Sequence, residues 1–403
     1  MQCEGVALNM GVNVMSKFQI AERLVRVPTY LFAEIDRVKN EVKARGVDII
    51  NLGIGDPDLP TPKFIVKAMQ ESVTRTANHQ YPSYTGLLSF RTAVADWYRI
   101  RFGVVLNPET EVISLIGSKE GIAHFPFAFI DPGDLALVCS PNYPVYNIAI
   151  SLAGGEVQFV PLTDSYAFLP NLEAIPEEIW VMAKCIFVNY PNNPTAATAS
   201  RNFYERLIAK ALEYNVIVVH DAAYSEIYFN EFNKPCSILE FEGSKDIAIE
   251  FHSLSKSYNM TGWRIGMAVG NHALVQGLGK VKENMDSGIF QAVQEAGIVA
   301  LVQGEPYTRK MRDIYCKRRD LVLDALKKIG IQCRIPEATL YVWAQVPEGA
   351  GSSTDFVTCV LQETGVVVTP GNGFGAAGEG YFRISCTVDT ARLEEAVSRI
   401  VKL

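Results

Sequence analysis

The chain has 403 residues, of which 48% are hydrophobic and 20% are charged, and its formal net charge is -7. This length exceeds what one hydrophobic core usually holds, so we expect two domains, or one large α/β domain with a smaller one appended. Like charges form no run of five and no window of about 18 apolar residues occurs, which argues against a nucleic-acid-binding face, an anionic-membrane patch and a membrane span.

The first 46 residues precede the first predicted strand. Glu4 and Lys17 lie among short apolar stretches, without the basic start, continuous apolar segment and small-residue cleavage site of a secretory signal. We therefore expect a cytoplasmic protein. A helical pattern follows from Tyr30 to Arg45, and we expect it to pack on a second domain or to cover a cleft.

Between Val47 and about Gly270, short apolar runs alternate with turns and helical patterns. This alternation is typical of βαβ units and predicts a mainly parallel sheet. The predicted strands span residues 112–116, 135–138, 185–188, 216–219 and 247–251. The helix after the third of them has one apolar face, formed by Phe203, Leu207, Ile208, Ala211 and Leu212.

The last third of the chain has a different pattern. Residues Glu305 to Ile329 form the pattern of one long charged helix, which we expect to join two domains. Separated strands follow at 340–343, 366–368 and 381–384. We predict a large domain at residues 47–305, and a small α+β domain formed by residues 1–46 and 306–403.

Three successive predicted strands are followed by groups able to take part in chemistry. These groups are the amide of Asn193, the carboxylate of Asp221, and the hydroxyl and amine of Ser253 and Lys256. Ligands of open parallel sheets bind beyond the carboxyl ends of the strands, so we expect these groups to meet in one crevice. The turn Gly117-Ser-Lys-Glu-Gly121 adds a helix N-terminus, which suits a phosphate.

The eight cysteines show no Cys-x-x-Cys pair and no spacing suited to a zinc site. We expect reduced thiols in a reducing compartment and no bound metal.

Several motifs carry these groups, and each of them alone is usually an ordinary loop, strand edge or helix cap. Their order and spacing resemble those of fold type I pyridoxal-phosphate enzymes, specifically the aspartate aminotransferase-like class, from about Tyr30 to Leu403. The matching motifs are Tyr190-Pro-Asn-Asn-Pro-Thr195, Asp221-Ala-Ala-Tyr224, Ser253-Leu-Ser-Lys256, Gly262-Trp-Arg-Ile-Gly266 and Phe382-Arg-Ile-Ser385.

The resemblance implies an α/β fold, with a mainly parallel seven-stranded sheet in the large domain and a smaller α+β domain. It implies a pyridoxal 5'-phosphate-dependent aminotransferase that acts on amino acids and 2-oxo acids. It also implies a homodimer with shared active sites.

The resemblance gives roles to five residues around the cofactor ring. Lys256 matches the lysine that binds the cofactor aldehyde and moves the substrate proton. Asp221 matches the carboxylate that stays anionic beside the ring nitrogen and keeps it protonated. Tyr224 and Asn193 match the groups that hydrogen-bond the phenolic oxygen of the cofactor, and Tyr143 matches the aromatic residue stacked on the ring.

The same resemblance assigns a phosphate site and a substrate site. The phosphate contacts are the backbone amides of Ser118 and Lys119, the hydroxyls of Ser253 and Ser255, the guanidinium of Arg264, and Tyr81 from a neighbouring subunit. We expect Arg264 on an apolar strand, in a paired and partly buried position. Arg383 matches the residue that binds the substrate α-carboxylate bidentately, and the backbone of Gly55, together with Asn193, lines the same site.

One residue departs from the family pattern. Many relatives have glycine after Asn-Pro-Thr, where this chain has Ala196. A left-handed backbone would be strained at an alanine, so we expect that the turn could differ without loss of chemistry.

The resemblance also narrows the substrate. In residues 282–289, where some aspartate-specific relatives carry an arginine for the distal carboxylate, this chain has none. Five stretches are most similar to LL-diaminopimelate aminotransferases, which transfer an amino group from glutamate to tetrahydrodipicolinate in lysine and peptidoglycan synthesis. These stretches are residues 30–35, 81–86, 116–122, 252–264 and 369–375.

Other functions remain open at this point. The alternatives are an alanine, aspartate, methionine or aromatic aminotransferase, a lyase acting at Cβ, and an effector-sensing protein without turnover. Transcription regulators with this fold carry an added DNA-binding segment, and the residues before the first strand show no basic helix-turn-helix pattern.

Overall fold

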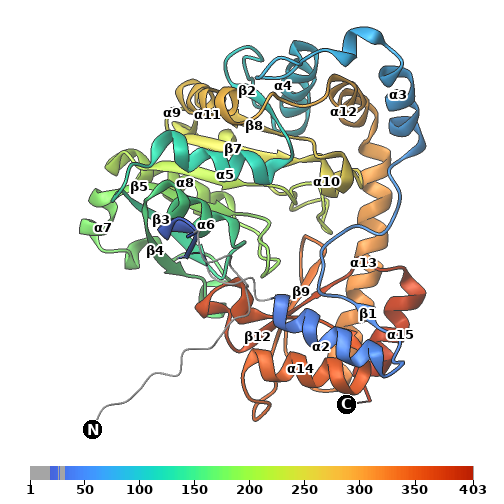
Figure 1. Cartoon of the computed structure of the whole chain (residues 1–403). Helices are drawn as coiled ribbons and strands as arrows, with labels where there is room; N and C mark the ends of the chain where they lie inside the picture. The colour runs from blue at the N-terminus through green and yellow to red at the C-terminus, as the bar shows by residue number, and fades with distance from the viewer. Residues whose placement is uncertain (1–18, 26, 28–31, 403) are drawn as a thin grey trace.

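The computed structural model describes residues 19–25, 27 and 32–402 (Figure 1). Cys3, Tyr30, Leu31 and the segment around Glu4 and Lys17 lie outside the described residues. Two parts are visible, one built on a large sheet and one built on a small sheet. We call them the large part and the small part.

The large sheet has seven strands in the order β2-β8-β7-β6-β5-β3-β4. All neighbouring strands pair in parallel except β8, which runs antiparallel to both β2 and β7. The prediction of a mainly parallel seven-stranded sheet is therefore confirmed. The strands are β2 (Val112–Leu115), β3 (Leu135–Ser140), β4 (Glu156–Pro161), β5 (Ala183–Asn189), β6 (Ile217–Asp221), β7 (Ala248–Ser253) and β8 (Gly266–Gly270).

Helices cover both faces of this sheet, and successive residues of the central strands point to opposite faces. Phe187 and Val219 pack with one group of helices, whereas Ile186 and Val218 pack with the other. The first group is α5 (Ser118–Phe129), α6 (Val145–Ala153) and α11 (His272–Met285). The second is α4 (Leu88–Phe102), α8 (Arg201–Tyr214) and α12 (Gln291–Gln303).

Helix α8 has the predicted apolar face with one exception. Phe203, Leu207, Ile208 and Ala211 are buried, but Leu212 is 42% exposed because it lies at the border of that face. The remaining helices of the large part are α3 (Lys63–Val73), α7 (Glu177–Met182), α9 (Ser244–Ile247) and α10 (Leu254–Ser257). The short helix α1 (Glu22–Val25) precedes them.

Helix α13 (Glu305–Lys328) runs from the large part to the small part, as the long charged pattern predicts (Figure 1). The small part has an antiparallel sheet in the order β11-β12-β9 and the helices α14 and α15. Its elements are β9 (Tyr341–Gln345), β11 (Thr369–Pro370), β12 (Tyr381–Ser385), α14 (Ser353–Thr364) and α15 (Thr390–Ile400). Helix α2 (Phe32–Ala44) packs against this part through Val38 and Val42, which contact Leu361, so the expectation for the N-terminal helix is confirmed over its described residues.

The first described strand pairs with the small part rather than with the large sheet. We placed the start of the large domain at residue 47, and β1 (Ile50–Asn51) pairs in parallel with β10 (Val366–Val367). Ile50 and Leu52 are buried in the core of the small part, because this apolar run has its only strand partner there among the described residues. We propose that the boundary falls after this strand and the loop that follows it.

Candidate active site

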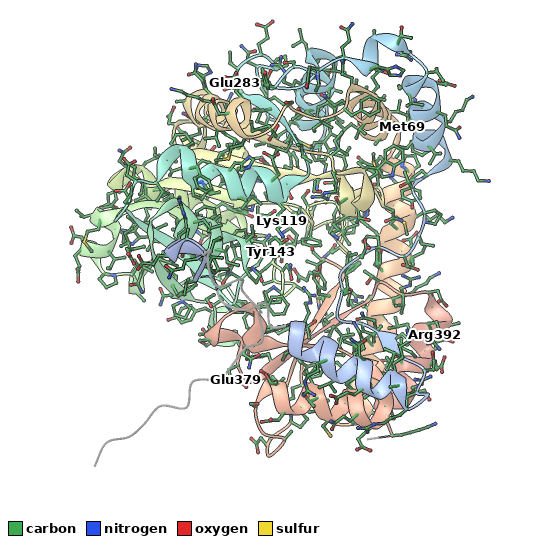
Figure 2. All side chains as sticks on the ribbon, in the orientation of Figure 1. Met69, Lys119, Tyr143, Glu283, Glu379 and Arg392 are labelled. Carbon is green, nitrogen blue, oxygen red and sulfur yellow. The ribbon has the colours of Figure 1, made fainter. Side chains whose placement is uncertain are left out.

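A pocket of about 610 Å³ opens between the two parts, at the carboxyl ends of β5, β6 and β7. Lys119 and Tyr143 lie side by side along this opening (Figure 2), with the amine of Lys119 6.0 Å from the centre of the Tyr143 ring. The pocket brings together all but one of the predicted site residues. They are Gly55, Ser118, Lys119, Tyr143, Asn193, Asp221, Tyr224, Ser253, Ser255, Lys256, Arg264 and Arg383.

Lys256 lies in α10, one short turn after β7. The Ser253 hydroxyl at the end of that strand accepts a hydrogen bond from the Ser255 amide at 3.2 Å and caps the turn. The Lys256 amine donates to the Gly55 carbonyl oxygen at 2.6 Å. Burial lowers the pKa of Lys256, because a charged amine loses solvation there. More of this amine is therefore uncharged and nucleophilic at a given pH.

Asp221 ends β6 and is buried. Burial raises the pKa of its carboxyl group, and hydrogen bonds to the carboxylate oppose that rise. The Tyr146 hydroxyl donates to Oδ2 at 2.7 Å, and the Ala223 amide donates to Oδ1 at 3.2 Å. Sequence reasoning missed Tyr146, because an aromatic residue on the apolar face of α6 is most often only part of a core.

Arg383 extends from β12 toward the large part and is 5% exposed. Its Nη1 donates to the Asn193 side-chain oxygen at 2.6 Å, and its Nη2 donates to the Gly53 carbonyl oxygen at 2.7 Å. The guanidinium also lies over the ring of Tyr341, 4.1 Å from its centre. Its Nε has no hydrogen-bond partner although it is buried. A buried guanidinium held in this way is preorganised to bind a carboxylate.

Tyr341 is a second residue that sequence reasoning missed. Its hydroxyl lies 2.8 Å from that of Tyr224, which connects β9 to the large part. The Tyr341 hydroxyl also explains Gly55, because a Cβ atom at that position would lie only 1.9 Å from it. Burial and the Tyr341 hydroxyl raise the pKa of Tyr224 well above its usual range. Tyr224 is thus a neutral hydrogen-bond donor at ordinary pH.

The predicted phosphate site lies at the start of α5. Gly117 has φ +76°, and a Cβ atom there would lie 2.4 Å from Nη2 of Arg264, so only glycine permits this close approach. The Ser255 hydroxyl is buried without a hydrogen-bond partner. The free amides of the helix, this hydroxyl and the guanidinium form a donor set suited to a phosphate.

The expectation for the surroundings of Arg264 was wrong. Arg264 precedes β8 and has φ +54°, and its side chain is exposed. It donates to the carbonyl oxygens of Thr261 and Ile116, at 3.1 and 3.4 Å. It is exposed because it lies in a left-handed turn that precedes β8, before the chain enters the sheet. Arg264 nevertheless lines the pocket.

Tyr81 is the one predicted contact outside this pocket. Its side chain is 89% exposed and does not line the pocket of its own chain. Its assignment to the site of a neighbouring subunit therefore stays a prediction.

The turn at Ala196 keeps the left-handed backbone despite the missing glycine. Ala196 has φ +59° and is buried, and its amide donates to the Asn192 carbonyl oxygen at 3.0 Å. The expectation that the turn could differ from that of relatives with glycine is therefore not met. The hydrogen bond and the packing around it hold the strained conformation.

The last turns of α11 and Asp286 form a largely buried charge cluster with α5, outside this pocket. The Lys282 amine donates to both oxygens of Glu120 at 3.0 Å, and to Asp286 at 3.0 Å. Glu120, His124 and Asp286 have a spacing that could suit a cation. The ammonium group of Lys282 already donates to both carboxylates and offsets one of their two charges, so we assign no metal there.

The pocket as a whole suits a phosphate-bearing aromatic aldehyde. It combines a phosphate-type donor set, the Tyr143 ring, an amine with a lowered pKa at Lys256, and the buried carboxylate of Asp221. These are the groups that bind pyridoxal phosphate and use it as an electron sink.

The chain belongs to the family of class I and II aminotransferases, whose family model matches residues 47–400. It is therefore a pyridoxal-phosphate-dependent enzyme that transfers amino groups. Over 389 residues, which are 96% of this chain and 100% of the relative, it is 69% identical to an LL-diaminopimelate aminotransferase of Nitratidesulfovibrio vulgaris.

Solved structures of similar proteins agree with the fold. The substrate-bound structure of BacF from Bacillus subtilis is 36% identical, with a TM-score of 0.91 over 96% of this chain and 98% of that one. An aspartate aminotransferase double mutant of Thermus thermophilus is 27% identical, with a TM-score of 0.90 over 96% and 99%. The fold is thus aspartate aminotransferase-like. Within the described part of the chain, no helix combines the length and apolarity needed to cross a bilayer.

Proposed function

We propose that this enzyme transfers an amino group between glutamate and tetrahydrodipicolinate, forming LL-diaminopimelate for lysine and peptidoglycan synthesis. The observation that carries the proposal is the identity of 69% to a full-length relative of that name. The pocket supports it, because Lys119 and Lys39 line it in addition to Arg383, and such a surface suits substrates with two carboxylates.

Bound pyridoxal phosphate supplies an electron sink that accepts the pair left on the substrate Cα when its proton is removed. The residues around it perform the other tasks. Arg383 binds the substrate α-carboxylate and so fixes the orientation of Cα. The Lys256 amine, whose pKa is lowered by burial, accepts the Cα proton as a general base. Asp221 would pair with the ring nitrogen of the cofactor and keep it protonated, and the Tyr146 hydroxyl holds that carboxylate in place.

Two further features complete the proposal. The enzyme works as a homodimer, in which the exposed Tyr81 of one subunit reaches the phosphate site of the other. It works in the cytoplasm, which agrees with the seven free cysteines among the described residues.

The experiment is a half-reaction followed by absorbance. Purified, cofactor-loaded protein is mixed separately with LL-diaminopimelate, glutamate, alanine, aspartate and an aromatic amino acid, without an acceptor. We expect only LL-diaminopimelate and glutamate to convert the cofactor rapidly to its amino form. Conversion by the other amino acids alone would confirm an aminotransferase but rule out the proposed substrate. Release of ammonia and pyruvate would indicate a lyase.

A further inference from the structure

The loop after β1 supplies three backbone carbonyl groups as hydrogen-bond acceptors, and that of Gly55 accepts from the Lys256 amine. Gly53 accepts hydrogen bonds from Arg383 at 2.7 Å and from the Thr369 hydroxyl at 2.9 Å. Ile54 accepts one from the Thr387 hydroxyl at 2.7 Å. The loop lies outside every helix and strand of the large part, so contacts beyond it must fix the position of these carbonyl groups.

Asp58, at the end of this loop, forms such a contact with Arg318 of α13. The guanidinium donates from Nη1 to Oδ1 at 2.7 Å and from Nη2 to Oδ2 at 2.9 Å, which is a bidentate ion pair. The Arg318 side chain is 3% exposed and that of Asp58 is 18% exposed. Solvent therefore screens this pair less than an ordinary surface pair.

Arg318 also holds the other side of the same site. Its Nη1 donates to the Cys386 carbonyl oxygen at 3.1 Å. Cys386 directly follows β12, the strand that carries Arg383. One guanidinium therefore contacts both the loop that bears the Gly53 carbonyl and the chain that bears Arg383.

Neither member of the pair lines the pocket, so neither can touch substrate or cofactor there. We propose that Asp58 and Arg318 are positioning residues, which hold the Gly53 carbonyl group and Arg383 in the relative orientation that binds the substrate α-carboxylate. This inference rests on the proposed function, because it needs Arg383 to be the α-carboxylate contact. Loss of the pair loosens the loop and turns the Arg383 guanidinium away from its preorganised direction.

The test compares D58N, R318K and the double variant D58N/R318K with the wild type as cofactor-loaded enzymes. KM and kcat are measured for glutamate and for LL-diaminopimelate. In D58N we expect KM to rise about tenfold for both amino acids and kcat to fall by a smaller factor. R318K keeps the charge but loses the bidentate geometry, so its KM should be intermediate.

The double variant shows whether Asp58 and Arg318 raise KM through one shared contact or through two independent contacts. If Asp58 and Arg318 act as one unit, the KM of D58N/R318K should not exceed that of D58N. If the two effects multiply, the proposed unit is wrong.

E111Q is the matched control for the loss of a charge pair. The Glu111 side chain is 17% exposed, close to the value for Asp58, and it pairs with Lys245 at 2.7 Å. It precedes β2, at the end of that strand opposite to the pocket. E111Q should lower the thermal unfolding midpoint to an extent similar to D58N and leave both KM values unchanged.

The outcomes distinguish this inference from the proposed function. Normal turnover of the wild type with an unchanged KM in D58N would overturn the positioning role alone, and so would an equal rise of KM in E111Q. No turnover of either amino acid by the wild type would overturn the proposed function and this inference with it. If D58N does not accumulate as folded protein, R318K decides the question by the same comparison.

Discussion

The two sides of the pocket are built in different ways. On the side of the large part, Asn193, Asp221 and Lys256 lie at the end of three consecutive strands of one sheet, or within a few residues after it. On the side of the small part, Arg383 is held by Asn193 and Gly53, which are 190 and 330 residues away along the chain. The chemistry thus depends on short-range turns, whereas substrate binding depends on contacts between distant segments.

The largest expected effect comes from a change on the side of the pocket that the large part forms. K256A should lower turnover by at least about 10⁴-fold, because it removes the amine that the proposed mechanism uses to bind the aldehyde and to accept the Cα proton. The phosphate site is separate from this amine, so the variant should still bind pyridoxal phosphate noncovalently. Steady-state rates and fluorescence titration with the cofactor measure the two properties, and near-normal turnover would contradict the role of Lys256.

The next effect tests the side of the small part. R383A should raise KM about 100-fold for every amino acid substrate, because removal of a buried, hydrogen-bonded charge costs roughly 3 kcal/mol of binding. R309A is the control, since Arg309 lies on α13 with 66% of its side chain exposed. A rise in KM for one substrate only would instead make Arg383 a side-chain contact.

A smaller effect should appear in the pH dependence. Burial raises the pKa of Asp221, and the Tyr146 hydroxyl opposes this by donating to the carboxylate. Y146F removes the donor, so the pKa of Asp221 should rise further and the carboxylate should be protonated at a higher pH. We therefore expect the acidic limb of the kcat/KM profile, and of cofactor affinity, to move to higher pH.

The control for that shift is Y166F, since Tyr166 is 54% exposed and lies outside the pocket. An acidic limb in Y146F that coincides with that of Y166F would show that Tyr146 does not act on Asp221.

The smallest effect concerns the strained turn. A196G should relieve the left-handed conformation of the alanine at φ +59° and stabilise the protein by about 0.5–1 kcal/mol, after the greater freedom of glycine in the unfolded chain is subtracted. Denaturant unfolding measures the change, and KM and kcat should stay constant. A loss of stability would mean that the surrounding contacts need the alanine methyl group.

Sequence reasoning succeeded where residues lie next to the strands that place them. The motifs around Asn193, Asp221 and Lys256 indicated the sheet edge, and the structure brings these residues to one pocket. The long helix was predicted because its charged pattern is local as well. The antiparallel β8 and the pairing of β1 with β10 were not predicted, since strand partners depend on distant segments.

The residues that sequence reasoning missed all act across long distances in the chain. Tyr146 contacts Asp221 from 75 residues away, Tyr341 contacts Tyr224 from 117, and Arg318 contacts Asp58 from 260. No spacing rule connects such pairs, because the fold alone brings them together. Arg264 was placed correctly in the pocket but wrongly on a strand, since a left-handed turn at a non-glycine residue has no clear sequence signal.

The burial of Lys256 has a consequence for how the enzyme acquires its cofactor. Only an uncharged amine attacks an aldehyde, and lysines at the surface stay almost fully charged near neutral pH. The lowered pKa of Lys256 favours attack by this amine over attack by an ordinary surface lysine when the newly folded chain meets free pyridoxal phosphate. The same burial that suits Lys256 to proton transfer therefore also favours this lysine in the reaction with the aldehyde.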